Sequence, residues 1–182
     1  MPKTRFTELV KKLFGNDYLF TGVEIGTASG IWTEYVLRNL NIKKLYTIDP
    51  YRHFPNEQYE GGRPQEWHDK IKSVADKRLG KYNNLERMIV TSAEACFKLA
   101  NIGKFDFVYI DGNHNEEYIK SDVMNYWPLV RRGGVFAGHD YNLPQIKSTV
   151  DWFFGDRLNV IKEERVWSVS YTHLRAHETS LH

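Results

Sequence analysis

The sequence has only one cysteine, Cys96, which excludes an internal disulfide and fits a reducing compartment. No apolar run is long enough to cross a membrane, and the first residues lack the pattern of a secretory signal peptide. The 25 basic and 23 acidic residues leave a formal net charge of +2, which is too small to indicate binding to nucleic acid or to a membrane surface. We therefore expect a cytoplasmic protein with neither a nucleic-acid partner nor a membrane partner.

Strand-like and helix-like patterns alternate along the chain, which predicts an α/β fold with a doubly wound sheet. Hydrophobic residues make up 41% of the 182 residues, enough to bury a sizeable core in one domain. The unbroken apolar run over residues 105–110 predicts a strand that is buried on both faces. Other strands are expected at residues 88–91 and, after a turn at Gly133 and Gly134, at residues 135–138.

The segment from Val23 to Gly30 predicts a ligand-binding turn between a strand and a helix. The beginning of a helix leaves backbone N–H groups unpaired, and glycine lets the backbone approach a ligand closely. Asp49 ends the next apolar run. A carboxylate about 20 residues after such a turn can accept hydrogen bonds from both hydroxyls of a ribose. Together these features predict a cofactor that contains a nucleoside.

Polar residues also follow two later strands of the predicted sheet. Asp111 follows the run at residues 105–110, and His139 and Asp140 follow the run at 135–138. Because the carboxyl ends of parallel strands meet at one edge, we expect these three side chains to face the same crevice. An imidazole and two carboxylates suit a divalent ion or a general base. The alternatives are a helix cap for Asp111 and a hydrogen-bonded loop histidine for His139.

Four further polar positions remain. Three of them have two interpretations each, and the fourth is expected to have a structural role. His114 either joins the site or braces its loop, and Asp122 either braces that loop or faces solvent. Ser92 either lines an adenine or caps a helix together with Glu94. Asp106 begins its strand at the opposite edge of the sheet, where we expect a structural role.

Taken together, these motifs resemble those of class I S-adenosylmethionine-dependent methyltransferases. The most similar family is the type 24 methyltransferase-domain family, near the macrocin and rhamnosyl O-methyltransferases. The resemblance spans about Phe20 to Trp167, and it rests on three segments: residues 46–50, residues 109–114 and residues 133–141.

The resemblance implies a Rossmann-like sheet of seven strands in the order 3-2-1-4-5-7-6, with the last strand antiparallel. It implies methyl transfer from S-adenosylmethionine to the hydroxyl of a small molecule or sugar. The cofactor-binding residues that it implies are Glu24, Gly26, Thr27, Gly30, Asp49, Ser92, Ala93 and Asp111. His139 and Asp140 become the candidate catalytic residues, and Asp111, His139 and Asp140 stand where metal-dependent relatives hold Mg²⁺, which leaves Mg²⁺ or Mn²⁺ as a further cofactor.

Two other functions remain open. A nucleotide-sugar or NAD-binding enzyme would also have a Rossmann sheet, although the loop from Gly26 to Gly30 fits its G-x-G-x-x-G pattern poorly. A pseudoenzyme that binds the cofactor without turnover is the second alternative.

The end of the chain is expected to be a non-native tail, over residues 168–182. The segment from Val169 to Thr179 resembles the translation of a transposase-based sequencing adapter. We therefore expect residues 1–167 to form a single methyltransferase domain, with a last strand that is a candidate for truncation at that boundary.

Overall fold

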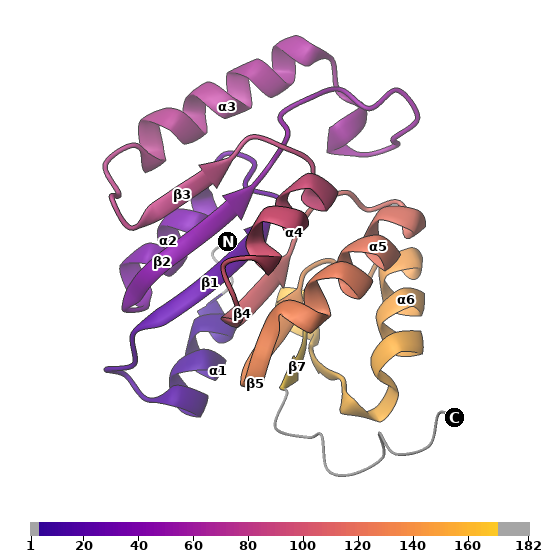
Figure 1. Cartoon of the computed structure of the whole chain (residues 1–182). Helices are drawn as coiled ribbons and strands as arrows, with labels where there is room; N and C mark the ends of the chain where they lie inside the picture. The colour runs from indigo at the N-terminus through magenta and orange to yellow at the C-terminus, as the bar shows by residue number, and fades with distance from the viewer. Residues whose placement is uncertain (1–3, 171–182) are drawn as a thin grey trace.

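The computed structural model describes residues 4–170, in which a seven-stranded sheet lies between two layers of helices (Figure 1). The strand order is β3-β2-β1-β4-β5-β7-β6, which confirms the predicted order and the Rossmann-like fold. The strands are β1 (Phe20–Ile25), β2 (Ile42–Ile48), β3 (Leu85–Met88), β4 (Phe105–Ile110), β5 (Val130–Gly138), β6 (Asn159–Ile161) and β7 (Val166–Ser170). The first five run parallel, and β7 is antiparallel to both of its neighbours.

Helices cover both faces of this sheet because its central strands are apolar on both sides. The six α-helices are α1 (Thr4–Phe14), α2 (Ile31–Asn39), α3 (Gln65–Leu79), α4 (Ser92–Ala100), α5 (Glu116–Tyr126) and α6 (Pro144–Phe154). In β4, Phe107 and Tyr109 pack with the apolar faces of α1 and α2. The alternate residues Val108 and Ile110 pack with residues of α4, α5 and α6. Figure 1 shows these three helices on the other side of the sheet from α1 and α2.

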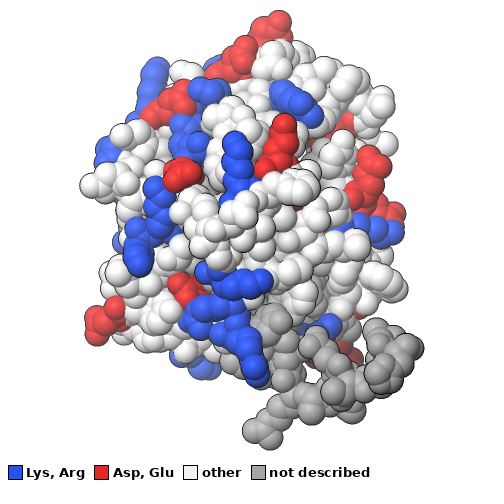
Figure 2. All heavy atoms as spheres, in the orientation of Figure 1, with Lys and Arg blue, Asp and Glu red and all other residues white. Residues whose placement is uncertain are grey.

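Charged side chains are mixed on the surface. Figure 2 shows Lys and Arg interspersed with Asp and Glu on the face in view, as the near balance of 25 basic and 23 acidic residues leads one to expect. Within residues 4–170, no helix combines the length and the apolar character that crossing a membrane requires.

Asp106 has the structural role predicted for it. This buried carboxylate accepts hydrogen bonds from the Tyr18 hydroxyl at 2.9 Å and from the Thr21 amide at 2.7 Å, and it pairs with Arg131. These contacts join the beginning of β4 to β1 and β5. They lie at the edge of the sheet where the parallel strands begin, opposite the edge formed by their carboxyl ends.

Two strands differ from the predictions. The third strand covers Leu85–Met88 rather than residues 88–91, because its two central residues are charged and the strand therefore contains no apolar run. The apolar run that suggested residues 88–91 belongs to the following loop, where Ile89 is 43% exposed. Strand β5 begins at Val130 rather than Val135, since Gly133 forms an irregularity within the strand (φ 79°) instead of a turn before it.

Strand β7 includes three residues that the sequence assigns to the tail. Ser168, Val169 and Ser170 pair with β5, and the first two are buried. The remainder of the expected tail, residues 171–182, lies outside the described residues.

Candidate functional site

Four strands end at one edge of the sheet and bring predicted residues together. Gly26, Asp49, Asp111 and His139 directly follow β1, β2, β4 and β5. Backbone bonds fix this edge: the Asp111 amide donates to the Ile25 carbonyl at 2.7 Å, and the His139 amide donates to the carbonyl of the last β4 residue at 3.0 Å. The crevice predicted at the strand ends is therefore formed by adjacent backbone segments.

The loop after β1 depends on two glycines for different reasons. Gly26 has φ 93°, and a Cβ atom there would lie 2.0 Å from the Asp111 carbonyl oxygen. Gly30 has φ 76°, and a Cβ atom there would lie 2.6 Å from Leu79 Cδ1 in α3. Ala28, between them, also has a left-handed conformation, with φ 44°. Such strain is retained where the surroundings determine the backbone strongly, as they do here.

Asp49 joins this loop to the turn after β2. Its carboxylate accepts hydrogen bonds from the Ala28 amide at 2.8 Å and from the Tyr51 amide at 2.9 Å. Burial raises the pKa of Asp49, while the bonds from the two amides act to lower it. The Tyr51 hydroxyl donates to the Ala28 carbonyl at 2.8 Å, so that Tyr51 contacts the loop directly through its hydroxyl and indirectly, through Asp49, by its amide.

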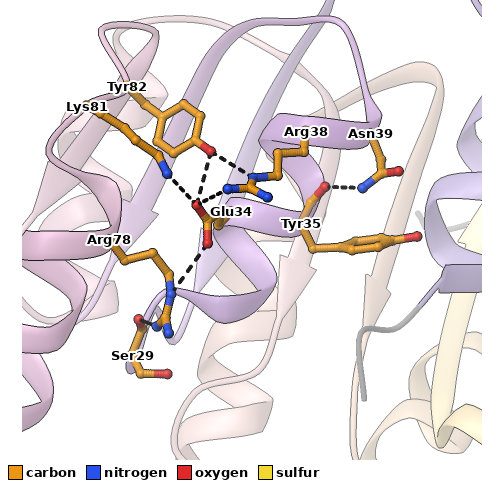
Figure 3. A network of polar contacts seen from close by, with 8 residues as sticks. All are labelled: Ser29, Glu34, Tyr35, Arg38, Asn39, Arg78, Lys81 and Tyr82. Atoms are coloured by element: carbon orange, nitrogen blue, oxygen red, sulfur yellow. Dashed lines mark hydrogen bonds and ion pairs between the residues drawn. The ribbon is translucent and has the colours of Figure 1, made fainter.

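A network of charged side chains supports the same loop from the side of α3 (Figure 3). Arg78 donates to the Ser29 carbonyl and lies 3.5 Å from Glu34 in α2. Lys81 and Arg38 also contact Glu34, at 2.8 and 3.0 Å. Arg78 alone among these three cations touches the loop, so it couples the position of the loop to α3.

A cavity of about 180 Å³ opens beside the loop. Its lining includes four of the predicted cofactor-binding residues: Gly26, Asp49, Ser92 and Asp111. The other four, Glu24, Thr27, Gly30 and Ala93, are not among the described residues that line it. Glu24 is only 1% exposed and accepts a hydrogen bond from the Thr33 hydroxyl at 2.6 Å. The structure thus separates the predicted residues that line the cavity from those that lie outside its lining.

The helix cap beside this cavity is Thr91 rather than Ser92. The Thr91 hydroxyl accepts from the Glu94 amide, and the Glu94 carboxylate accepts from the Thr91 amide, which is a capping box. Ser92 is the first residue of α4 and lines the cavity. The alternative interpretation of Ser92 as the cap is therefore wrong.

His139, Asp140 and Asp111 form a close cluster next to the cavity. His139 Nδ1 lies 2.9 Å from Asp140 Oδ1 and 3.4 Å from Asp111 Oδ1. One ligand atom from each residue falls within 4.8 Å of the others. His114 joins the group, because its Nε2 lies 2.8 Å from Asp140 Oδ2. Asp140 thus lies between two imidazoles.

The electrostatics of this cluster favour an ionised Asp140. Burial acts to raise the pKa of Asp140, but the hydrogen bonds from His114 and His139 outweigh it and hold that pKa well below its usual range. Burial in turn acts to lower the pKa of His114, and the hydrogen bond to Asp140 raises it overall. Asp140 has a left-handed backbone with φ 56°, which turns the chain sharply after β5.

A second cavity, of about 720 Å³, lies on the far side of His114 and Asp140, and both residues line it. His114 lines the first cavity as well. The rest of the second lining is mostly polar: Glu57, Gln58, Tyr59, Glu60, Gly62, Arg63, Asn142, Leu143 and Arg165. His114 therefore borders both cavities, Asp111 borders the smaller one and Asp140 the larger one, whereas His139 is not among the described residues that line either.

The lining of the smaller cavity also includes polar residues that were not predicted to contact a ligand, among them Asn113 and Asp122. Asp122 is 2% exposed. Asp122 could have been found from its spacing, because it lies in one helical stripe with Ile119, Val123 and Tyr126, all of which are buried. Its carboxylate therefore does not face solvent.

Comparison with known proteins identifies the family. A family model described as a methyltransferase domain, of type 24, matches residues 23–141, which is more than half of the chain. No curated protein matches the chain. The family match sets aside the alternative of a nucleotide-sugar or NAD-binding enzyme.

Solved structures share the fold. CalS11, a calicheamicin methyltransferase, has 14% identity over 92% of this chain and 78% of its own, with a TM-score of 0.65. An O-methyltransferase from Bacillus cereus, in complex with S-adenosylhomocysteine, has 17% identity over 93% of this chain and 82% of its own, with a TM-score of 0.61. The N-methyltransferase NodS from Bradyrhizobium japonicum WM9 has 14% identity over 91% and 93%, with a TM-score of 0.54.

At these identities the structural likeness shows the fold alone, and it includes enzymes that methylate oxygen and enzymes that methylate nitrogen. The family match therefore carries the assignment. The chain therefore belongs to the methyltransferase domain family and is an S-adenosylmethionine-dependent methyltransferase.

Proposed function

We propose that the enzyme transfers a methyl group from S-adenosylmethionine to a hydroxyl group of a small polar molecule, such as a sugar. The observation that carries this proposal is the position of His139, whose Nδ1 lies 2.9 Å from Asp140 and 3.4 Å from Asp111. A hydroxyl acceptor loses its proton as it attacks, and an imidazole held by carboxylates can take that proton. The family comparison leaves the acceptor atom open, so the argument for oxygen rests on this local geometry.

The smaller cavity is the proposed cofactor pocket. Asp49 retains carboxylate lone pairs beyond its two amide contacts, and these can accept the ribose hydroxyls. Gly26 and Asp111 flank the methionine end of the cofactor, and Ser92 flanks the adenine. Glu24, Thr27, Gly30 and Ala93 support the surrounding walls. When bound, S-adenosylmethionine supplies an electrophilic methyl carbon on a sulfonium sulfur, and the pocket orients that carbon toward the acceptor.

We also propose that Asp111, His139 and Asp140 hold a divalent cation. Their donor atoms lie within 4.8 Å of one another, and two carboxylates plus one imidazole nitrogen suit Mn²⁺ better than Mg²⁺. Such an ion would lower the pKa of an acceptor hydroxyl at this position. Metal ligation and proton removal need different protonation states of His139. A general base keeps its proton on Nδ1, toward Asp140, and takes the acceptor's proton at Nε2, whereas a metal ligand binds through an unprotonated Nδ1. Metal dependence of turnover separates the two roles.

The larger cavity is the proposed acceptor site. Carboxylates, amides and guanidinium groups line it, and the Tyr59 ring lies 5.1 Å from the His114 ring at its edge. A polyhydroxylated molecule can both donate to the carboxylates and accept from Arg63 and Arg165. This lining is the support for a sugar among small-molecule acceptors.

The test is methyl transfer from labelled S-adenosylmethionine to panels of sugars, other alcohols and amines, with Mn²⁺, with Mg²⁺ and with a chelator. We expect labelled hydroxyl products, and a loss of turnover of about a hundredfold or more in His139→Ala, because that is the usual contribution of a general base. Tyr18→Phe is the control and should keep full turnover, since the Tyr18 hydroxyl bonds to Asp106 at the opposite edge of the sheet. Full turnover in His139→Ala, or transfer to amines alone, would contradict the proposal.

A further inference from the structure

Two residues that line the smaller cavity each have a buried polar atom that makes no hydrogen bond within residues 4–170. One is Oδ1 of Asp122 and the other is Nδ2 of Asn113. Asp122 is only 2% exposed, so water does not freely solvate it. Leaving a buried acceptor or donor unpaired is costly, and such an atom in a pocket indicates a group that is paired when the ligand is present.

The position of Asp122 is fixed by the elements around it. Asp122 projects from α5 toward the first residue of α4, and a hydrogen bond from Ser92 lowers its pKa against the larger effect of burial. The Tyr126 hydroxyl donates to the Ser92 carbonyl at 2.6 Å, which holds α4 against α5. On the other side, Asp122 Oδ2 would lie 3.9 Å from a Cβ atom on Gly112. The carboxylate is therefore held between the turns that follow β3 and β4.

This position lies at the nucleobase end of the cavity. Asp49, the proposed ribose ligand, follows β2, and the Ser92 region follows the adjacent strand β3. A nucleoside whose ribose lies at Asp49 can extend its base toward Ser92 and hence toward Asp122. Gly26 and Asp111, by contrast, lie at the ends of the central strands β1 and β4.

The two unpaired atoms match the edge of an adenine ring. Its exocyclic amine donates hydrogen bonds, and its ring nitrogens accept them. A carboxyl oxygen can accept from the amine, and an amide NH₂ group can donate to a ring nitrogen. The remainder of the lining includes Ile48, Ile71 and Trp67, which offer apolar contact to a flat base.

We propose that Asp122 is a specificity-determining residue for the cofactor, and that its Oδ1 accepts a hydrogen bond from the exocyclic amine of adenine. This inference rests on the proposed placement of the cofactor in the smaller cavity. A site that is built to bond an N–H group rejects an analogue without it, since the buried acceptor is then left unpaired. Asp122 thus selects adenine among purines.

The first part of the test changes the ligand. Calorimetry compares wild-type protein binding S-adenosylhomocysteine, S-inosylhomocysteine, in which a carbonyl oxygen replaces the amine, and the purine analogue in which hydrogen replaces it. We expect S-adenosylhomocysteine to bind at least about tenfold more tightly than either analogue. Equal affinity for S-adenosylhomocysteine and the hydrogen analogue would overturn the inference. Absence of any binding by folded protein would overturn the cofactor placement itself, and the inference with it.

The second part changes the protein. In Asp122→Asn, the amide can donate to the inosine carbonyl, so we expect the preference for S-adenosylhomocysteine over S-inosylhomocysteine to fall by about tenfold or more. In Asp122→Leu, the amine and hydrogen analogues should bind alike. Asp151→Asn, in α6 outside the cavity lining, is the control and should keep the wild-type ratios. Wild-type ratios in a folded Asp122→Asn variant would overturn the inference, and the ligand series remains decisive if Asp122→Leu fails to fold.

Discussion

The hydroxyl of Tyr51 donates a hydrogen bond of 2.8 Å to the carbonyl oxygen of Ala28, and so fastens the turn after β2 to the loop after β1. The amide of the same tyrosine donates to Asp49, whose other oxygen accepts from the Ala28 amide. Tyr51 and Ala28 both have positive φ values, 46° and 44°. Two strained segments thus hold each other in place around Asp49, the residue that we propose binds the ribose.

Removing the Tyr51 hydroxyl should weaken cofactor binding. In Tyr51→Phe the Ala28 carbonyl loses its side-chain donor, and a neutral hydrogen bond of this kind contributes about 1 kcal/mol. We expect the Kd for S-adenosylhomocysteine, measured by calorimetry, to rise about fivefold. Tyr18→Phe is the matched control, because the Tyr18 hydroxyl bonds to Asp106 at the opposite edge of the sheet. An equal loss of affinity in both variants would argue against a local role for Tyr51.

The network in Figure 3 predicts a difference between two arginines. Arg78 contacts both Glu34 and the Ser29 carbonyl, whereas Arg38 contacts Glu34 but not the loop. In Arg78→Met the loop loses this support, and we expect S-adenosylhomocysteine affinity to fall several-fold, by about 1 kcal/mol. Arg38→Met should change affinity little, since an exposed ion pair contributes less than about 1 kcal/mol. Similar affinities of the two variants would show that Arg78 does not position the loop.

Asp106 should affect stability without affecting the site. In Asp106→Asn, Arg131 keeps a half-buried charge beside a neutral amide, and Tyr18 and Thr21 lose a charged acceptor. We expect the free energy of unfolding, measured with urea, to fall by about 2 to 3 kcal/mol. Cofactor affinity of the folded variant should be unchanged. A variant of normal stability with weakened cofactor binding would contradict the assignment of Asp106 to structure alone.

The free energy of unfolding should depend on pH through the buried carboxyl group of Asp122. Burial raises its pKa from 3.8 to about 7, although a hydrogen bond from Ser92 acts to lower it. The folded state binds the proton of Asp122 more tightly than the unfolded state does. The stabilising contribution of protonated Asp122 to the free energy of unfolding is therefore complete below about pH 4 and is lost as the pH rises through 7. Asn does not titrate.

Relative to wild type, the free energy of unfolding of Asp122→Asn should therefore increase between pH 4 and pH 8, by at most about 4 kcal/mol. Urea titrations of the ligand-free protein at several pH values measure this difference. Burial and the charge of Asp122 raise the pKa values of the neighbouring Cys96 and Tyr126, so both groups keep their protons in the folded state over this pH range and add little to the difference. A difference that does not vary with pH would mean that Asp122 keeps an ordinary pKa in the folded protein.

The sequence predicts the fold well because the central strands are apolar on both faces and end in polar motifs. The run at residues 105–110 and the acid after it specify β4 and its place in the crevice without further information. The edge strand β3 is predicted too late in the chain, because the charged Glu86 and Arg87 separate Leu85 from Met88 and leave no apolar run. A strand of four residues with neither an apolar run nor an alternation gives no clear hydrophobic pattern.

Within the site, sequence predicts which residues follow strand ends but not which side chains reach the cavity. Asp111, His139 and Asp140 come together as expected. Gly30, in contrast, packs against Leu79 of a helix that is distant in sequence. The unpaired oxygen of Asp122 depends on the packing of α5 against α4, which local patterns do not determine.

The most direct test of the account is calorimetric titration of wild-type protein and Asp49→Asn with S-adenosylhomocysteine. Asp49 lines the pocket between Ala28 and Tyr51, so the account predicts stoichiometric binding by wild type and a loss of affinity of at least about tenfold in the variant. Asp106→Asn, which removes a buried charge at the other edge, should bind as wild type does. No binding by folded wild-type protein, or equal binding by folded Asp49→Asn, would contradict the placement of the cofactor at the strand ends.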